Sequence, residues 1–429
     1  MKITSINIEN FKVIDSLQFN PRMLNILVGR NNTGKTSILQ ATKLAFDEEY
    51  FSFLFPTHPS AALKYGEKRA KLELKLTEDK RNMVELEIER GTINELIPQL
   101  EKTVKEIFEL ALKGVGYANR KTPKNEERKR KAGEIERELK EWLNTETILE
   151  MVEKDQLTDL AKDSVNLIVK GQGTFLPGFT IEIMAQKLAF QIAEKLNFRE
   201  FLGWEEPRNA RFRYYTPFRE SFEDFVFSVF EGEEVSKEEE ILSSPIFIDD
   251  PIKALDIVKS DRKRNEVTAH EIDQIIKDDK IVPDLTRFNF NKLVFEGVED
   301  DVSMDSMGDG FKALIGILAS LYQRPKNTVV LLEEPEVHMH PGYLQELTKY
   351  LVTLSRTRNI QLFISTHSMD FIQCFLDLDS MSTPNSKFVK SQFYMLRLSH
   401  PKNVEVSEEI DYDEADRAIK ELEWDLRGI

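Results

Sequence analysis

Residues 24 to 46 read LNILVGRNNTGKTSILQATKLAF, and this stretch indicates the fold class most directly. The apolar run from Leu24 to Val28 is typical of a buried strand, and the apolar residues from Ile38 to Phe46 recur at helical spacing. Between them, GRNNTGKT matches the pattern of a phosphate-binding loop, for which a strand before and a helix after are the expected context. A chance match is the competing interpretation, and the flanking elements argue against it.

The residue types of this loop suit a nucleoside triphosphate. Glycines let backbone amides turn toward phosphate oxygens, and the start of the helix adds a favourable dipole. We expect the Lys35 ammonium to bind the β and γ phosphates and the Thr36 hydroxyl to ligate Mg²⁺. The predicted ATP-binding residues of the loop are Gly29, Asn31, Asn32, Thr33, Gly34, Lys35, Thr36 and Ser37.

A second apolar strand, VVLLEEP at residues 329 to 335, ends in two carboxylates. Because charges at the end of a buried strand need a counter-charge or bound water, this stretch predicts the acidic half of the nucleotide site. Glu333 would face Mg²⁺, and Glu334 would act as the general base for the attacking water. The alternative is an ordinary strand end with exposed acids.

Histidines follow both of the later apolar strands. His367 comes directly after IQLFIS, at the end of a strand where it could reach a γ phosphate; taken alone, it would be an ordinary surface histidine. His338 and His340 lie two residues apart in EVHMHP and suggest a metal site, although a loop that contacts a neighbouring subunit is the preferred interpretation.

The hydrophobic pattern predicts an α/β protein. Further strands are expected at residues 2 to 8 and 360 to 365, and helices at 311 to 322 and 341 to 354. Apolar strands that alternate with helices indicate a parallel or mixed sheet covered on both faces. The alternating stretches 71 to 77 and 84 to 89 predict an antiparallel hairpin, and a helical, charge-rich insertion is expected to open at residue 96. 

One more glycine-bearing loop, SMGDG at residues 306 to 310, precedes an apolar helix. With GRNNTGKT, LLEEPEVHMHP and ISTHS, it completes a set of motifs that resembles the ABC-type ATPases of the SMC, RecF and OLD group, most of all the ATPase part of OLD-family and related phage-defence proteins. The resemblance implies that Ser306 and Gly308 bind the γ phosphate of ATP held by a second subunit, and that His367 is the switch. The implied partner is another copy of the chain in a head-to-tail dimer or a higher oligomer.

This sequence departs from those families in several places. OLD nucleases continue into a Toprim nuclease domain, and the roughly 60 residues after His367 are too few for one, so we expect a separate effector protein. The insertion is too short and too broken for an SMC coiled coil. Glu333 stands where most relatives have Asp, and Gln172 is a weak candidate for the Q-loop residue.

Composition limits the remaining choices. The 429 residues carry a formal charge of -16, which excludes a protein that coats nucleic acid over its whole surface. Basic runs at 120 to 137 and 259 to 264 are read as solvated helix faces, with local DNA contact as the alternative. A single cysteine, Cys374, and the absence of a signal peptide or a long apolar run favour a cytoplasmic protein with no membrane contact.

The motifs predict an ATPase that uses Mg²⁺, and the resemblance implies that it forms an ATP-sandwich dimer and regulates a separate effector in defence against phage. A RecF- or SMC-like DNA-repair ATPase and an ATP-dependent assembly scaffold remain the alternatives. The expected organisation is an ATPase domain split into residues 1–95 and 211–400, a helical insertion at 96–210, and an acidic tail helix at 401–429.

Overall fold

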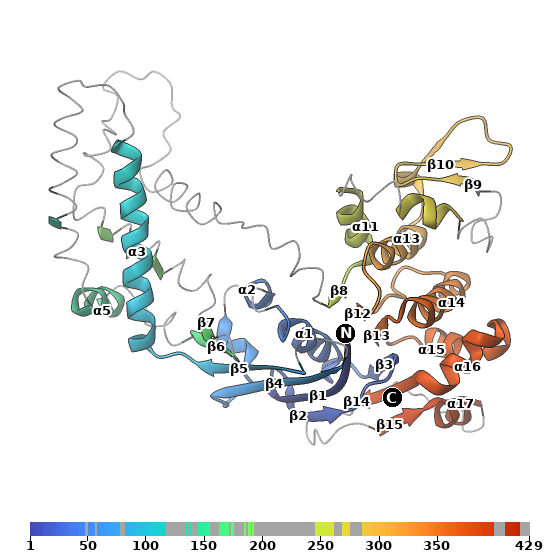
Figure 1. The fold of residues 1–429 in the computed structure, drawn as a ribbon, viewed down its shortest axis with the longest axis horizontal. Helices are drawn as coiled ribbons and strands as arrows, with labels where there is room; N and C mark the ends of the chain where they lie inside the picture. Colours follow the sequence, from blue (N-terminus) through green and yellow to red (C-terminus); the bar gives the residue numbers. More distant parts are fainter. Residues whose placement is uncertain are drawn as a thin grey trace. The chain divides into compact units, whose positions relative to one another are not determined.

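The computed structural model describes most of the chain outside a large central segment (Figure 1). The described residues are 1–47, 50–55, 58–77, 82–116, 145–154, 163–170, 173–175, 245–260, 268–274, 285–398 and 408–420, with short pieces between 134 and 192. The chain divides into two compact units. One comprises residues 1–50, 63–87 and 238–429, and the other comprises 51–62 and 88–237.

The first unit is built on a six-stranded sheet in the order β15-β14-β3-β13-β12-β8. Every neighbouring pair is parallel except β14 and β15, which are antiparallel. The central strands are buried along almost their whole length, as expected for parallel strands covered on both faces. The strands are β3 (Leu24–Gly29), β8 (Ile246–Ile248), β12 (Val329–Glu333), β13 (Gln361–Ser365), β14 (Phe393–Leu398) and β15 (Glu408–Asp411).

Helices lie on both sides of this sheet, with α1 on one side and α14 to α16 on the other (Figure 1). Helix α1 (Lys35–Leu44) contacts β3, β8, β12 and β13, and it also contacts strands of a second sheet, which explains why it is buried nearly all round. The helices of the other side are α14 (Pro341–Arg358), α15 (Met369–Leu376), α16 (Thr383–Gln392) and α17 (Tyr412–Lys420), with a short 3₁₀ turn at Leu378–Ser380.

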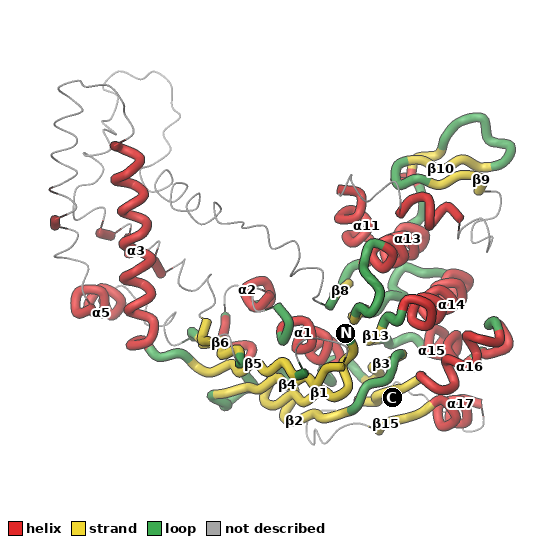
Figure 2. Tube along the Cα trace, in the orientation of Figure 1, coloured by secondary structure: helices red, strands yellow, loops and turns green. Residues whose placement is uncertain are grey.

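The second sheet of this unit is antiparallel, and along its strands buried side chains alternate with side chains that are partly or fully exposed. Its strands are ordered β2-β1-β4-β5, and both pairs that β1 makes, with β2 and with β4, are antiparallel (Figure 2). The strands are β1 (Lys2–Phe11), β2 (Ile14–Phe19), β4 (Arg69–Thr77) and β5 (Met83–Arg90). Because α1 lies against this sheet as well as the main one, the phosphate loop at its start is fixed from two sides.

The SMGDG loop belongs to a smaller group of elements. The loop begins at the last residue of a 3₁₀ turn, η2 (Met304–Ser306), and its last two residues start α13 (Asp309–Tyr322). Helix α13 packs across α11 (Pro251–Ser260). A Cβ on Gly316 would lie 2.0 Å from the backbone oxygen of Pro251, so this close crossing requires glycine. The associated sheet has the order β11-β10-β9, with β9 (Leu285–Phe288), β10 (Lys292–Phe295) and β11 (Val302–Ser303).

The second unit holds most of the predicted insertion. Its described elements are α2 (Tyr50–Leu54), the 3₁₀ turn η1 (Pro59–Ala62), α3 (Ile93–Gly116), α5 (Thr145–Lys154), β6 (Val165–Val169) and β7 (Gly173–Phe175). The stretch expected to be helical also contains two strands, because β6 and β7 form an antiparallel pair. The strand β6 is a short apolar run within a charge-rich region, and for that reason it was not predicted. Its residues Val165 and Leu167 are buried.

The α/β class with a largely parallel mixed sheet and an antiparallel β subdomain is confirmed. The predicted P-loop strand and helix, the hairpin strands, and the elements from α13 to β13 lie where the sequence places them, within a few residues. The strands β2, β8 and β14 were not predicted. The predicted strand at 213 to 216 lies outside the described residues. The expected tail helix is only partly a helix: residues 408–411 form the strand β15, residues 412–420 form α17, and residues 421–429 lie outside the described residues.

Candidate nucleotide site

Backbone conformations available to few residues shape the phosphate loop. Gly29 has φ 148°, and a Cβ there would lie 2.6 Å from the Leu398 backbone oxygen at the end of β14. Gly34 has φ 102° and Asn32 has φ 64°, both in the left-handed region. The loop therefore turns back sharply over the end of β3, and Gly34 leads directly into α1.

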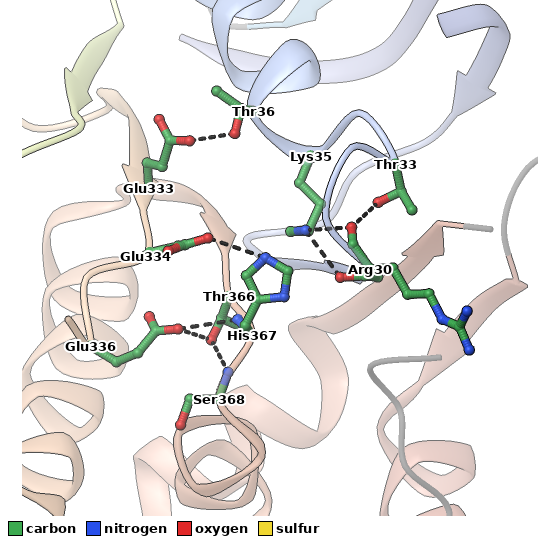
Figure 3. Close-up of polar contacts among 11 residues, drawn as sticks. Arg30, Thr33, Lys35, Thr36, Glu333, Glu334, Glu336, Thr366, His367 and Ser368 are labelled. Atoms are coloured by element: carbon green, nitrogen blue, oxygen red, sulfur yellow. Dashed lines mark hydrogen bonds and ion pairs between the residues drawn. The ribbon is translucent and has the colours of Figure 1, made fainter. Parts of the chain in front are cut away.

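Lys35 folds over this loop (Figure 3). Its Nζ donates to the backbone oxygens of Gly29 and Arg30, both at 3.0 Å, and the residue is only 5% exposed. Burial lowers the pKa of Lys35, while the nearby carboxylates, with Glu334 first, act in the opposite direction. The ammonium is thus held beside the acidic strand end, where a phosphate could replace the loop carbonyls as its partner.

Thr36 connects the phosphate loop to the acidic strand. Its hydroxyl donates to Glu333 Oε1 (Figure 3). Burial raises the pKa of the Glu333 carboxyl, the Thr36 bond lowers it, and the Glu334 and Asp249 carboxylates raise it further. A hydroxyl and a carboxylate are the oxygen donors that Mg²⁺ prefers.

These donors fit Mg²⁺ only if the nucleotide contributes as well. Within the described residues, no three His, Cys, Asp or Glu side chains are grouped so that they could hold a metal. Mg²⁺ is commonly held by one or two protein oxygens together with substrate phosphates and water. Thr36 and Glu333 have the right chemistry for that arrangement.

Glu334 and His367 meet at the ends of neighbouring parallel strands. The residue pair Glu333 and Ser365 is in register between β12 and β13, so the residues that follow are side by side. His367 Nε2 lies 3.2 Å from Glu334 Oε1, and both side chains are about one-third exposed (33% and 39%) (Figure 3). Glu334 itself has φ 43°, a strained conformation for a residue with a side chain. A carboxylate and an imidazole are thereby held together beside Lys35.

The predicted signature residues are exposed. Ser306 and Gly308 are both accessible, and a Cβ on Gly308 would meet no described atom within 4 Å. Gly308 has φ -64° and ψ 153°, a conformation that any residue adopts, so its lack of a side chain is not needed for the fold of this chain. Gly310 differs, because a Cβ there would lie 2.8 Å from the His338 backbone oxygen.

The structure shows where His338 and His340, the two histidines considered as metal ligands, lie. His340 caps α14, since its Nδ1 accepts from the Gly342 amide at 3.2 Å, and His338 is exposed with φ 71°. Among the described residues neither belongs to a metal-binding group. Gln172 lies outside the described residues.

Sequence reasoning missed Asp249. It follows β8, whose last residue Ile248 pairs with Leu332 in parallel register, so Asp249 stands beside Glu333 at the same sheet edge. Its charge contributes to the raised pKa of Glu333. The signal was a short apolar run, IFI, followed by DDP and a helix, which is too brief for periodicity to reveal a strand.

A phosphate loop, an acidic strand end and a histidine at one edge of a parallel sheet define a P-loop ATPase. A family model described as AAA ATPase domain matches residues 1–372, and the chain belongs to that family. Together with a partial similarity to an Old nuclease, the match confirms the expected P-loop ATPase of the SMC/OLD-like, ABC type.

The curated relatives match short parts of the chain. Uncharacterized protein MJECL11 of Methanocaldococcus jannaschii is 34% identical over 71 residues, which are 17% of this chain and 61% of that protein. Old nuclease of Escherichia phage P2 is 29% identical over 101 residues, which are 22% of this chain and 15% of that protein. The chain therefore spans less than two thirds of the length of either relative.

Two solved structures resemble the chain over most of its length. The SMC head domain from Thermotoga maritima is 12% identical, with 96% of this chain and 99% of that chain covered and a TM-score of 0.40. An Smc head domain bound to the C-terminal domain of ScpA, from Pyrococcus furiosus, is 12% identical, with 98% and 99% covered and a TM-score of 0.42. Scores below 0.5 do not establish a shared fold.

Proposed function

We propose that two copies of this chain close around two ATP molecules and hydrolyse them at composite sites. The observation that carries the proposal is the division of the site within one chain. Lys35, Thr36, Glu333, Glu334 and His367 lie together, whereas Ser306 and Gly308 are exposed on their own loop. The open space over Gly308 suits the close approach of a phosphate held by another subunit.

Each residue has a role that its position supports. The backbone amides of residues Gly29 to Ser37 and the Lys35 ammonium bind the phosphates, and Asn31 and Asn32 are exposed on the open side of the loop. Mg²⁺, held through Thr36 and Glu333, would neutralise developing phosphate charge. Glu334 takes the proton of the attacking water, and His367 orients Glu334 and binds the γ phosphate.

We further propose that the ATPase regulates a separate effector in defence against phage. The observation that supports the link to phage is the partial similarity to Old nuclease of Escherichia phage P2, over 101 residues. We also propose that the chain is organised as an ATPase domain in two parts, 1–95 and 211–400, with an insertion at 96–210 and a tail at 401–429. In the described residues every helix is too short or too polar to cross a membrane, and a cytoplasmic location is part of the same proposal.

A DNA-binding ATPase is the second candidate, and the basic residues of the insertion favour it. Arg128 to Lys131 form a run of four cations in an acidic chain, and they lie outside the described residues. Reversal of these four charges should abolish salt-dependent DNA binding and DNA-stimulated hydrolysis if DNA is the partner. ATP-driven assembly without turnover would instead favour a scaffold.

Complementation between two inactive variants tests the composite site. Ser306→Arg should block dimer closure while leaving ATP binding intact, and Lys35→Ala should remove binding. In a mixed dimer both changes fall on one composite site and the other is wild type, so mixing should restore part of the ATPase activity. Full hydrolysis by Ser306→Arg as a monomer in light scattering would contradict the proposal.

A further inference from the structure

A third carboxylate, that of Glu336, lies close to the catalytic pair but does not face the phosphate loop (Figure 3). Glu336 Oε1 accepts a hydrogen bond from the Thr366 hydroxyl and another from the His367 amide, the latter at 3.1 Å. The Thr366 hydroxyl in turn accepts from the Ser368 amide at 2.9 Å. A single carboxylate oxygen, Oε1, therefore contacts both Thr366 and His367 in the loop that carries the histidine.

The loop that carries Glu336 is itself fixed. The Glu334 amide donates to the Ser365 backbone oxygen at 3.0 Å, and the Val337 amide donates to the Glu334 oxygen at 3.0 Å. Glu334 has φ 43° and His338 has φ 71°, so the turn that joins β12 to α14 folds back on itself. This turn places the Glu336 side chain against β13 rather than in solvent.

Burial of the Glu336 carboxylate costs free energy of folding unless hydrogen bonds compensate for the lost hydration. Glu336 Oε2 is buried and has no hydrogen-bond partner among the described residues, and burial raises the pKa of the Glu336 carboxyl. An aliphatic side chain would fill the space without that cost. A carboxylate supplies something an aliphatic chain cannot, namely strong acceptance from the His367 amide and the Thr366 hydroxyl.

We infer that Glu336 is a positioning residue, which clamps the residue 366–368 loop so that the His367 imidazole meets Glu334. The clamp also reaches α15, because Ser368 caps that helix by accepting from the Phe371 amide at 3.1 Å. The fixed backbone leaves His367 little freedom except rotation of its side chain. The inference rests on the proposed hydrolytic function only for its kinetic consequence.

Hydrogen exchange tests the clamp without any need for activity. In Glu336→Leu the His367 amide loses its acceptor, so its exchange, followed by mass spectrometry of peptides spanning residues 362–370, should accelerate about 10-fold or more. Glu336→Gln keeps an acceptor oxygen and should stay closer to wild type. Thr366→Val removes the hydroxyl that donates to Glu336 and leaves Glu336 itself unchanged. It replaces Glu336→Leu as the test variant if Glu336→Leu fails to fold. Unchanged exchange in both Glu336→Leu and Thr366→Val would overturn the clamp.

A double-mutant cycle tests the positioning role. Glu336→Leu should lower kcat about 10- to 100-fold with KM unchanged, because misplacement of a reacting group costs that much. Glu336→Gln should lose less. In a His367→Ala background the same substitutions should change kcat less than about twofold, since they act through His367. Glu346→Gln, a matched loss of charge on α14 where Glu346 pairs with Lys349, should leave kcat unchanged.

Active-site concentrations are taken from the stoichiometry of ATP binding by calorimetry, so that a smaller folded fraction is not mistaken for a lower kcat. Equal losses in the presence and absence of His367 would show that Glu336 only supports the fold, and would overturn the inference. If wild-type protein binds ATP but does not hydrolyse it, the proposed function fails, and hydrogen exchange at His367 alone decides the inference.

Discussion

Replacement of Glu334 by Gln should separate catalysis from stability. The Glu334 side chain is 39% exposed and its His367 partner is 33% exposed, so their 3.2 Å contact between a carboxylate and an imidazole is partly solvated. Pairs of this kind stabilise a fold by at most about 1 kcal/mol. Glu334→Gln keeps the size of the side chain and an oxygen that can face the imidazole. We therefore expect a melting temperature within a few degrees of wild type.

The same substitution removes the proposed general base. Such a base contributes about 10²- to 10⁴-fold to the rate, equivalent to about 3 to 5 kcal/mol of transition-state stabilisation. Release of phosphate under single-turnover conditions should fall by that factor, while calorimetry shows ATP binding retained. Glu346→Gln is the control for loss of one negative charge. If turnover by Glu334→Gln equals that of wild type, the base lies elsewhere, with Glu333 the next candidate.

Other perturbations test the phosphate loop, the packing and the cysteine. Lys35→Ala should reduce ATP binding below detection by calorimetry, and unchanged affinity in a folded variant would contradict the loop assignment. Gly316→Ala should destabilise the fold by about 1 to 3 kcal/mol in urea titrations, because the added methyl meets the Pro251 oxygen, whereas Gly308→Ala should leave stability unchanged. Burial raises the pKa of the Cys374 thiol to about 11, so at pH 8 it should react with iodoacetamide about 100-fold more slowly than in urea. Equal rates in buffer and urea would contradict that burial.

The parts of the site that the sequence predicts are those carried by long or strongly patterned segments. Three short segments are mostly apolar and end at glycine, glutamate or serine, so both the strands and the chemistry at their ends could be predicted. They are Leu24–Gly29, Val329–Glu333 and Gln361–Ser365. Parallel pairing then brings Glu334 and His367 to one edge. Their 3.2 Å contact follows from the register, which no local pattern specifies.

What escaped prediction depends on contacts between distant segments. Asp249 stands beside Glu333 only because the short strand Ile246–Ile248 pairs with β12, and β14 was overlooked although its Leu398 oxygen forces glycine at position 29. The clamp between Glu336 and the His367 loop joins residues 31 positions apart through a backbone amide. Such bonds carry no sequence pattern, because every residue except proline supplies a backbone N–H.

ATP is expected to bring two copies of the chain together through the SMGDG loop. The most direct measurement is the mass of Glu334→Gln by light scattering with and without ATP, compared with Glu334→Gln that also carries Ser306→Arg. ATP should double the mass from the monomer value of 49.8 kDa, and Ser306→Arg should abolish the increase while calorimetry still shows ATP bound. A mass that ATP leaves unchanged, or a dimer that forms equally well with Ser306→Arg, would contradict it.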